Sequence, residues 1–234
     1  MKPNILLLIS VIFSLSTLKG NTQVLNTGFG ESGIYLMATK NLSKSQMELR
    51  YGEIEGSPYL FEDFRKCDLN LKNGSEYKGI AVRLNIYDNN FEFQRGDTYY
   101  IFDKVDAIKL LKFMDGSKIT FVENKNKEIE GFYKIEAGEK YRLLTSLDVS
   151  FREGKSATNS YAEDISPQFI RIKDKQYIQR PDGSLIYLKN KKSFSKAFAT
   201  SHKEFVNYAK TNKLNPGNQE DLIKIIDYMN TSSK

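Results

Sequence analysis

Apolar and polar positions alternate most regularly in the stretch from Asp68 to Gln94. Within it, Asn73-Gly74 is a dipeptide that favours a two-residue type I′ hairpin turn. The strand after this turn keeps a period of two. Its apolar positions are Ile80, Val82, Leu84 and Ile86, and the positions that face the other way are Ala81, Arg83, Asn85 and Tyr87. This alternation predicts a β-meander with one face in a hydrophobic core and a more polar face opposite.

Turn signals of the same kind recur along the chain. Asp115-Gly116 separates the apolar segments 108–114 and 118–123, and Gly138-Glu139 separates 130–137 from 140–147. Roughly eight or nine short strands are therefore expected between residues 53 and 152, with no helical segment among them. This spacing indicates an α+β, mainly β fold, in which an antiparallel meander forms a sandwich or a partly open barrel.

The pattern changes after the strand-rich region. Residues 153–167 contain few apolar side chains and are expected to form a linker or a long loop. Residues 169–172 and 176–179 are predicted to pair as strands. Pro181-Asp182-Gly183 then turns the chain into a further strand at 185–188, and Asp-Gly-Ser here repeats the turn chemistry of the earlier hairpins.

Two to three short helices are predicted at the C-terminus. Ser193 can cap the first, Ser201 with Glu204 matches a capping box for the second, and Asn218 can start the last. The last helix has one apolar stripe, formed by Leu222, Ile225, Ile226 and Met229. That stripe must be covered, and packing within the chain is favoured over a partner. Residues 168–234 are therefore predicted to form a β-hairpin with a helical cap.

The first 20 residues have the features of a signal peptide. Lys2 precedes an apolar run from Ile5 to Leu15, which is followed by small residues. This run is too short for a bilayer crossing, which needs roughly 20 apolar residues. The only cysteine, Cys67, lies far beyond the run and is expected to be a half-buried structural thiol, so neither a lipoprotein anchor nor an internal disulfide is expected.

These features predict the cellular location of the protein and the layout of its N-terminal part. We expect an exported protein of the periplasm or the cell surface, with no transmembrane segment after signal cleavage. A loosely ordered segment over residues 21–52 would precede an antiparallel β domain over residues 53–152.

The charge is mildly basic. The formal net charge of +6 falls to +4 when Lys2 and Lys19 leave with the signal peptide. Acidic residues are interspersed with the basic ones, and together with export this argues against nucleic acid as a partner. One short basic cluster, KNKK at 189–192, precedes the helices and could contact an anionic surface.

Catalytic and metal-binding motifs are not evident. A single histidine, His202, and a single cysteine cannot supply a zinc or haem site or a nucleophilic couple, and no catalytic, cofactor-binding or metal-binding residue is assigned. Paired carboxylates leave a glycosidase open, because such pairs show no local signature. The close pairs are Glu62-Asp63, Glu128 with Glu130, and Glu220-Asp221.

The polar face of the long strand is the remaining candidate site. Arg83, Asn85 and Tyr87 are the candidate ligand-binding residues, because they could meet a sugar or an anionic group by stacking and hydrogen bonds. The competing interpretation is a solvent-facing or inter-strand polar ladder.

Three segments resemble a widespread family of uncharacterised exported proteins of Bacteroidetes-type bacteria. They are GSPYL at 56–60, RLNIY at 83–87 and YIQRPDGSLIYLKNKKSF at 177–194. The resemblance covers roughly residues 53–230, and one departure is Leu84, where the family often has tyrosine. It implies a periplasmic or cell-surface location and no catalytic residues that can be transferred.

The sequence therefore favours an exported envelope protein that acts as a non-enzymatic binding or structural module. An envelope protein or a glycan is the expected kind of partner. The alternatives are a hydrolase acting on polysaccharide or peptidoglycan fragments, and a polyanion-binding module.

Overall fold

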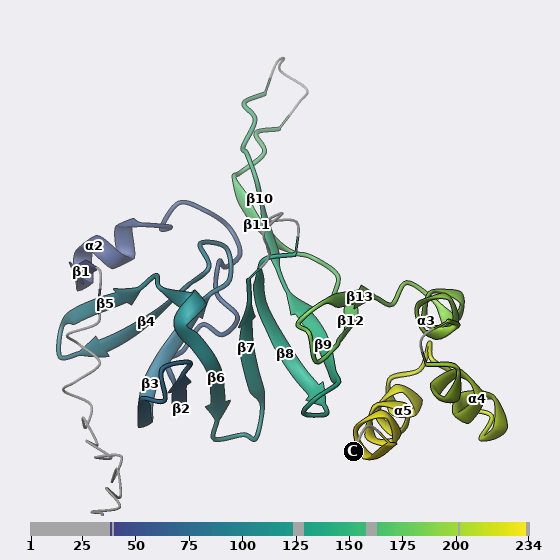
Figure 1. Cartoon of the computed structure of the whole chain (residues 1–234). Helices are drawn as coiled ribbons and strands as arrows, with labels where there is room; N and C mark the ends of the chain where they lie inside the picture. Colours follow the sequence, from purple (N-terminus) through teal and green to yellow (C-terminus); the bar gives the residue numbers. More distant parts are fainter. Residues whose placement is uncertain (1–37, 39, 124–128, 158–162, 201, 233–234) are drawn as a thin grey trace, which may run out of the picture.

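A computed structural model describes residues 38, 40–123, 129–157, 163–200 and 202–232 (Figure 1). The predicted signal peptide lies outside these residues. The strands are β1 Lys40–Ser43, β2 Arg65–Leu71, β3 Glu76–Asn85, β4 Asn90–Arg95, β5 Thr98–Phe102, β6 Ile108–Phe113, β7 Lys118–Val122, β8 Gly131–Ala137, β9 Arg142–Leu147, β10 Val149–Arg152, β11 Gln168–Arg171, β12 Gln176–Gln179 and β13 Leu185–Tyr187. The helices are α2 Lys44–Leu49, the 3₁₀ turn η1 Val105–Ala107, α3 Lys191–Phe198, α4 Lys203–Thr211 and α5 Gln219–Ser232.

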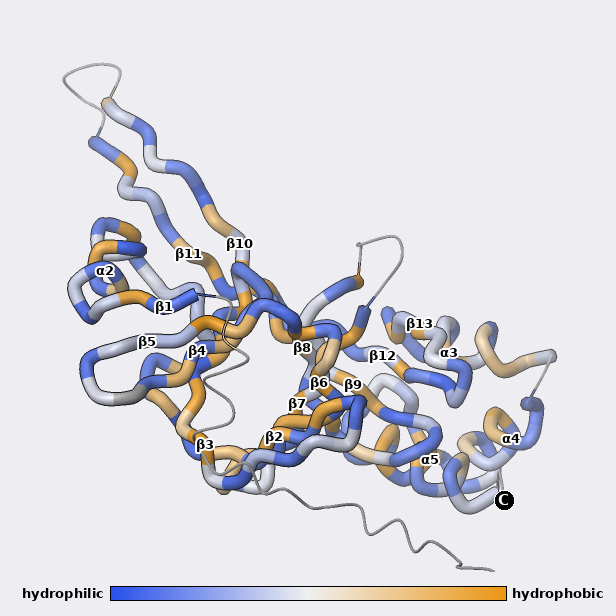
Figure 2. The backbone as a smooth tube through the Cα atoms, turned by 60° about the vertical axis from the view of Figure 1, so that its left-hand side comes forward, coloured by the Kyte–Doolittle hydropathy of each residue, from blue (hydrophilic) through white to orange (hydrophobic). Residues whose placement is uncertain are grey.

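One antiparallel sheet dominates the described residues. Its strand order is β1-β5-β4-β3-β2-β6-β7-β8-β9-β12-β13, so most neighbours in space are also neighbours in sequence. The sheet is strongly curved but not closed (Figure 2). The prediction of an α+β, mainly β fold with an antiparallel meander is confirmed, and β12 and β13 extend the same sheet beyond residue 167.

The main core lies on the face of the sheet that the alternation of β3 predicts. Ile80, Val82, Leu84 and Ile86 are all at most 3% exposed, and they pack with apolar residues from β2 and from β4 to β9. Cys67 joins this core and is fully buried, which raises the pKa of its thiol to about 12 because burial disfavours the thiolate. The side chain is therefore a structural residue, more deeply buried than expected.

The recurrent hairpin turns are present, but the prediction of a type I′ turn at Asn73-Gly74 is wrong. Gly74 donates its N–H to the carbonyl of Leu71 at 3.1 Å and is left-handed, whereas Asn73 is not. The loop is thus a turn followed by a left-handed glycine that forms a bulge. Its Asn73 side chain accepts from the N–H of Ser75 at 3.0 Å. The turns at Gly116 and Gly183 have the same arrangement.

The predicted pairing of residues 169–172 with 176–179 is wrong. Strand β11 pairs with β10, and β12 pairs with β9 and β13. As a result, β10 and β11 form a separate two-stranded arm that projects from the body of the protein (Figure 1). A bridge between Lys155 and Ile165 continues the ladder into the predicted long loop. Gly56 and Glu55 pack at the base of this arm, where Phe169 donates its N–H to the carbonyl of Glu55 at 2.8 Å.

Three helices cover one end of the sheet (Figure 1). The predicted stripe of α5 is confirmed, because its four apolar side chains are 0% exposed and pack with Leu143 of β9 and Ile178 of β12. Asn218 caps α5, as expected. The other two caps differ from the prediction: Asn190 caps α3 in a capping box with Ser193, and His202 is the N-cap residue of α4 without a side-chain capping bond.

None of the helices in the described part of the chain has the length and apolar character that a membrane crossing requires.

Candidate functional site

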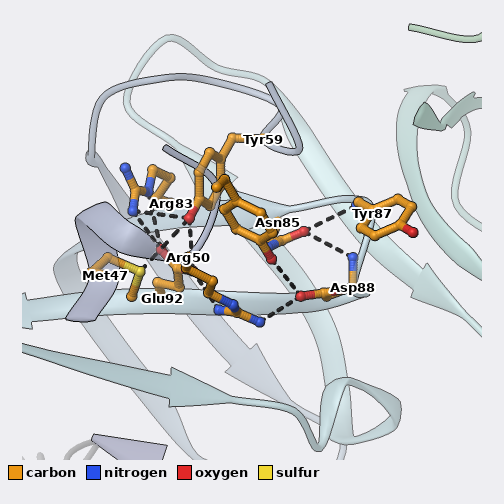
Figure 3. Close-up of polar contacts among 9 residues, drawn as sticks. Met47, Arg50, Tyr59, Arg83, Asn85, Tyr87, Asp88 and Glu92 are labelled. Atoms are coloured by element: carbon orange, nitrogen blue, oxygen red, sulfur yellow. Dashed lines mark hydrogen bonds and ion pairs between the residues drawn. The ribbon is translucent and has the colours of Figure 1, made fainter. Parts of the chain in front are cut away.

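The predicted polar face of β3 forms an ion pair with the neighbouring strand. Arg83 lies opposite Glu92 of β4, and its Nε and Nη2 donate to Oε2 of Glu92 at 3.1 and 2.7 Å (Figure 3). The Glu92 side chain is 0% exposed and that of Arg83 is 15% exposed. A carboxylate removed from water in this way needs several partners to offset its lost hydration.

The segment before β2 supplies those partners. Tyr59 donates its hydroxyl to Oε1 of Glu92 at 3.1 Å, and Arg50 approaches the same oxygen at 3.4 Å. The ring of Tyr59 also lies 3.8 Å from the guanidinium carbon of Arg83. Burial, together with the neighbouring Glu92 charge, raises the pKa of Tyr59, so this residue acts as a hydrogen-bond donor.

Asn85 belongs to the same cluster. Its Oδ1 accepts from the N–H groups of Tyr87 and Asp88 at 3.1 and 2.9 Å, and its Nδ2 donates to the hydroxyl of Tyr51 at 2.9 Å. Tyr51 and Arg50 both bind the carboxylate of Asp88 at 2.5 Å. Burial and the hydrogen bond to Asp88 raise the pKa of Tyr51. These contacts hold the segment from Arg50 to Tyr59 against β3 and β4.

The three sequence candidates therefore separate into two environments. Arg83 and Asn85 bind other residues of the chain, as in the inter-strand interpretation of this face. Tyr87 is 41% exposed and its ring packs 5.0 Å from that of Phe169. Their ligand-binding role stays a prediction, and the contacts give Arg83 and Asn85 a clear structural role.

A second surface has a different electrostatic character. Residues 189–213 contain seven lysines and one glutamate, so this stretch alone has a formal charge of +6 and the rest of the chain is balanced. All seven lysines are exposed. They belong to α3, α4 and the segments that flank these helices. The basic character of the protein is thus concentrated at its helical end.

Two grooves adjoin this basic end. The larger, here called the sheet groove, has a volume of 570 Å³. Its lysines are Lys134, Lys173, Lys175 and Lys189. The smaller, here called the helix groove, has a volume of 310 Å³ and lies between α3 and α4. Its lysines are Lys191, Lys210 and Lys213, over an apolar floor that includes Phe194 and Val206.

The two grooves are neighbours in the fold. Lys189 lines the sheet groove and Lys191 lines the helix groove, only two residues further along the chain. Pro216 and Gln219, which precede and begin α5, likewise line one groove each. The same two segments therefore border both grooves.

The floor of the sheet groove is a row of side chains across three strands. Lys134 of β8 lies opposite Thr145 of β9, which lies opposite Gln176 of β12. Glu136 stands at a register shift in β8 between Ile135 and Ala137, and it forms an ion pair with Lys134 at 2.9 Å. A groove of this kind offers cations, carboxylates and amides to a ligand within a short distance.

Sequence reasoning located only one part of this surface. The sequence shows the basic cluster at 189–192, and the charge of the segment up to residue 213 extends it. Lys134 lies in β8, whereas Lys173 and Lys175 lie in the loop before β12, and only the sheet brings this loop beside β8. No local pattern in the sequence identifies these three lysines as neighbours.

Comparisons of the chain with protein-family models, with curated proteins and with solved structures found no match.

Proposed function

We propose that this protein is an exported, non-enzymatic binding module of the bacterial envelope that holds an anionic polysaccharide on its basic helical end. The observation that supports the proposal is the segregation of charge. Residues 189–213 alone have a formal charge of +6, equal to that of the full chain, and the adjoining sheet groove adds Lys134, Lys173 and Lys175. A polymer with regularly spaced negative groups is the ligand that suits such a surface.

The expected strength comes from several weak contacts together. One exposed lysine paired with one anion contributes only about 0–1 kcal/mol, because both groups are well hydrated. The seven lysines of residues 189–213 act jointly when they bind one polymer, because the polymer is immobilised once and each further contact adds to the same binding event. Such binding must weaken steeply with salt, because each neutralised anion releases counterions.

The experiment is retention of the mature protein on immobilised heparin, with elution by a salt gradient. The variant is the triple substitution Lys191→Glu, Lys210→Glu and Lys213→Glu in the helix groove. The matched control is Lys66→Glu, Lys72→Glu and Lys78→Glu, which changes the net charge equally at exposed positions of β2, β3 and the loop between them.

We expect the groove variant to elute at a much lower salt concentration than the wild type and the control to elute close to the wild type. Equal shifts in the two variants would mean that only net charge matters and would contradict a defined site. A wild-type protein that passes through the column at moderate salt would refute the proposal.

A hydrolase is the second candidate, because the sheet groove contains two carboxylates. Glu136 is paired with Lys134, and Asp174 lies 3.9 Å from Arg171 with its side chain 55% exposed. A glycosidase acid instead needs surroundings that keep it protonated. Both carboxylates have a cationic partner, so binding is favoured over cleavage. Release of reducing ends from polygalacturonate, abolished by Glu136→Gln, would support hydrolysis.

A further inference from the structure

We infer that the helix groove binds the alkyl chain of an acylated anionic polysaccharide. This inference rests on the proposed function and names a substituent of the polymer. The groove combines three lysines with an apolar interior. A bare polyanion needs only the lysines, so the apolar interior indicates a ligand that is itself partly apolar.

The groove is formed by one face of each of two helices. Residues three and four apart on a helix share one face, and the lining follows this spacing in both helices. The lining residues are Lys191, Phe194 and Ser195 in α3, and Val206, Ala209 and Lys210 in α4, with Lys213 one turn further on. Both helices therefore direct the same kind of mixed face, with lysine beside apolar residues, toward the groove.

Part of the apolar interior is open to a ligand. Phe194 and Ala209 form the bottom of the groove and are 1% and 4% exposed. Val206 and Leu214 are only half-buried and pack against that bottom, so they keep apolar surface in contact with water. An alkyl chain that covers these two side chains removes apolar surface of both partners from water, which favours binding.

The lysines provide the position for an anionic group. Lys191, Lys210 and Lys213 are exposed, and none of them forms an ion pair within the described part of the chain. Among the described residues that line the groove there is no carboxylate. A ligand with a negative group at one end of an alkyl chain therefore complements the groove, with the anion at the rim and the chain inside.

The backbone at Lys213 supports a role for this lysine. The N–H of Lys213 donates to the carbonyl of Lys210 at 3.1 Å, and the N–H of Leu214 donates to the carbonyl of Ala209 at 2.8 Å. These two bonds form a Schellman motif, in which the residue at the position of Lys213 is left-handed and usually glycine. Lys213 has a φ of 55°. A side chain is unfavourable in this conformation, and such positions cluster at ligand sites.

An extended peptide suits the groove less well. Each of its residues presents an N–H group that needs an acceptor, whereas the lysines of the lining are donors. The side-chain oxygen of Asn215, which also lines the groove, already accepts from the N–H of Gly217 at 3.1 Å. An alkyl chain has no donors to satisfy, so it is the occupant that the lining favours.

The test is isothermal titration of the full mature chain with ethyl, butyl, hexyl and octyl phosphate, each below its micelle concentration. We expect the affinity to rise about two- to fourfold for each added methylene and to level off when the groove is filled. Inorganic phosphate lacks the chain and octyl glucoside lacks the charge. Each is expected to bind at least about tenfold more weakly than octyl phosphate.

Two variants locate the site. Ser195→Leu adds apolar bulk inside the groove and should reduce the ratio of octyl to ethyl phosphate affinity to less than about threefold. Asn207→Leu adds the same kind of bulk at an exposed position of α4 outside the lining, and it is the matched control that should leave the ratio unchanged. Lys213→Gly should weaken octyl phosphate binding about three- to fivefold and leave the urea midpoint unchanged or higher, which a purely structural lysine would not do.

The outcomes separate the two proposals. Equal affinity for all four alkyl phosphates, with heparin still retaining the protein, overturns the acyl inference and leaves the proposed function in place. Failure of the alkyl phosphates and of heparin to bind overturns both. The same rise with chain length in Ser195→Leu as in the wild type overturns the assignment to the helix groove. Thermal unfolding of each variant verifies the fold, and the series on the wild type tests the inference without any variant.

Discussion

Removing the carboxylate of Glu92 is expected to destabilise the fold more than most single substitutions. In Glu92→Leu, the guanidinium of Arg83 stays 85% buried and keeps only the hydroxyl of Tyr59, at 3.2 Å, as a partner within the cluster. Breaking a buried pair by removing one partner costs about 3–5 kcal/mol, because the other charge remains without compensation. That is a large part of a total stability of about 5–15 kcal/mol.

The pairwise origin of this effect is tested by a double-mutant cycle. Arg83→Met in the Glu92→Leu background removes the unpaired buried charge. The free energy of unfolding of the double variant should therefore be at least about 2 kcal/mol higher than that of Glu92→Leu. Arg83→Met alone is expected to cost less than Glu92→Leu, because Arg50 and Tyr59 remain beside the carboxylate at 3.4 and 3.1 Å.

The assay is urea unfolding followed by far-UV circular dichroism, with the midpoint and slope compared among the four proteins. The control is Glu48→Leu, whose carboxylate is 66% exposed in an ion pair with Lys44, and which should change stability by less than about 0.5 kcal/mol. A Glu92→Leu variant within 0.5 kcal/mol of the wild type, or additive single effects in the double variant, would refute the importance of this pair.

Three further predictions concern the core and the helical cap. The pKa of the Cys67 thiol rises from 9.0 to about 12 on folding, so the folded protein keeps a proton that the unfolded chain loses above pH 9. The stability contributed by this thiol is therefore full below pH 9 and declines toward pH 12. The substitution Cys67→Val should flatten that part of the profile of urea midpoint against pH. Gly138→Ala should loosen the helical cap, because a Cβ there would lie 2.0 Å from the Tyr141 carbonyl oxygen and 2.6 Å from Ile226; amide exchange in α5 should then accelerate more than in β3. Asn190→Ala should cost about 1 kcal/mol in thermal or urea unfolding by removing the N-cap of α3, and an unchanged midpoint would show that this cap contributes little.

Local patterns predicted the parts of the fold that depend on neighbouring residues. The alternation of β3 identified its buried face, and the stripe of α5 identified the residues that cover the end of the sheet. The turn dipeptides located the hairpins. They did not predict the backbone conformation of Asn73, because that conformation must match the twist and bulge of the flanking strands. Each of these features arises within a few residues, where side-chain period and backbone preference act directly.

Other expectations failed because the competing interactions were distant in sequence. Helix α2 was not predicted, and Met47 on its buried side packs under the hydroxyl of Tyr59. Residues 169–172 have strand character, but their partner is β10 and not the next strand along the chain. The pattern of a strand predicts that the strand will pair, but it does not predict the partner. The choice of partner depends on the core that is available on each side of the strand.

The candidate surfaces divide in the same way. The sequence by itself determined a mainly β fold, a buried row on β3, an apolar stripe on α5 and a basic cluster beginning at residue 189, because each is a matter of composition or short period. Only the tertiary structure decided that Arg83 meets a buried Glu92, and that Lys134, Thr145 and Lys175 share one groove. The physical reason is that pairing across strands joins residues far apart in sequence, so the charge and hydrogen bonding of a site emerge only when the sheet is assembled.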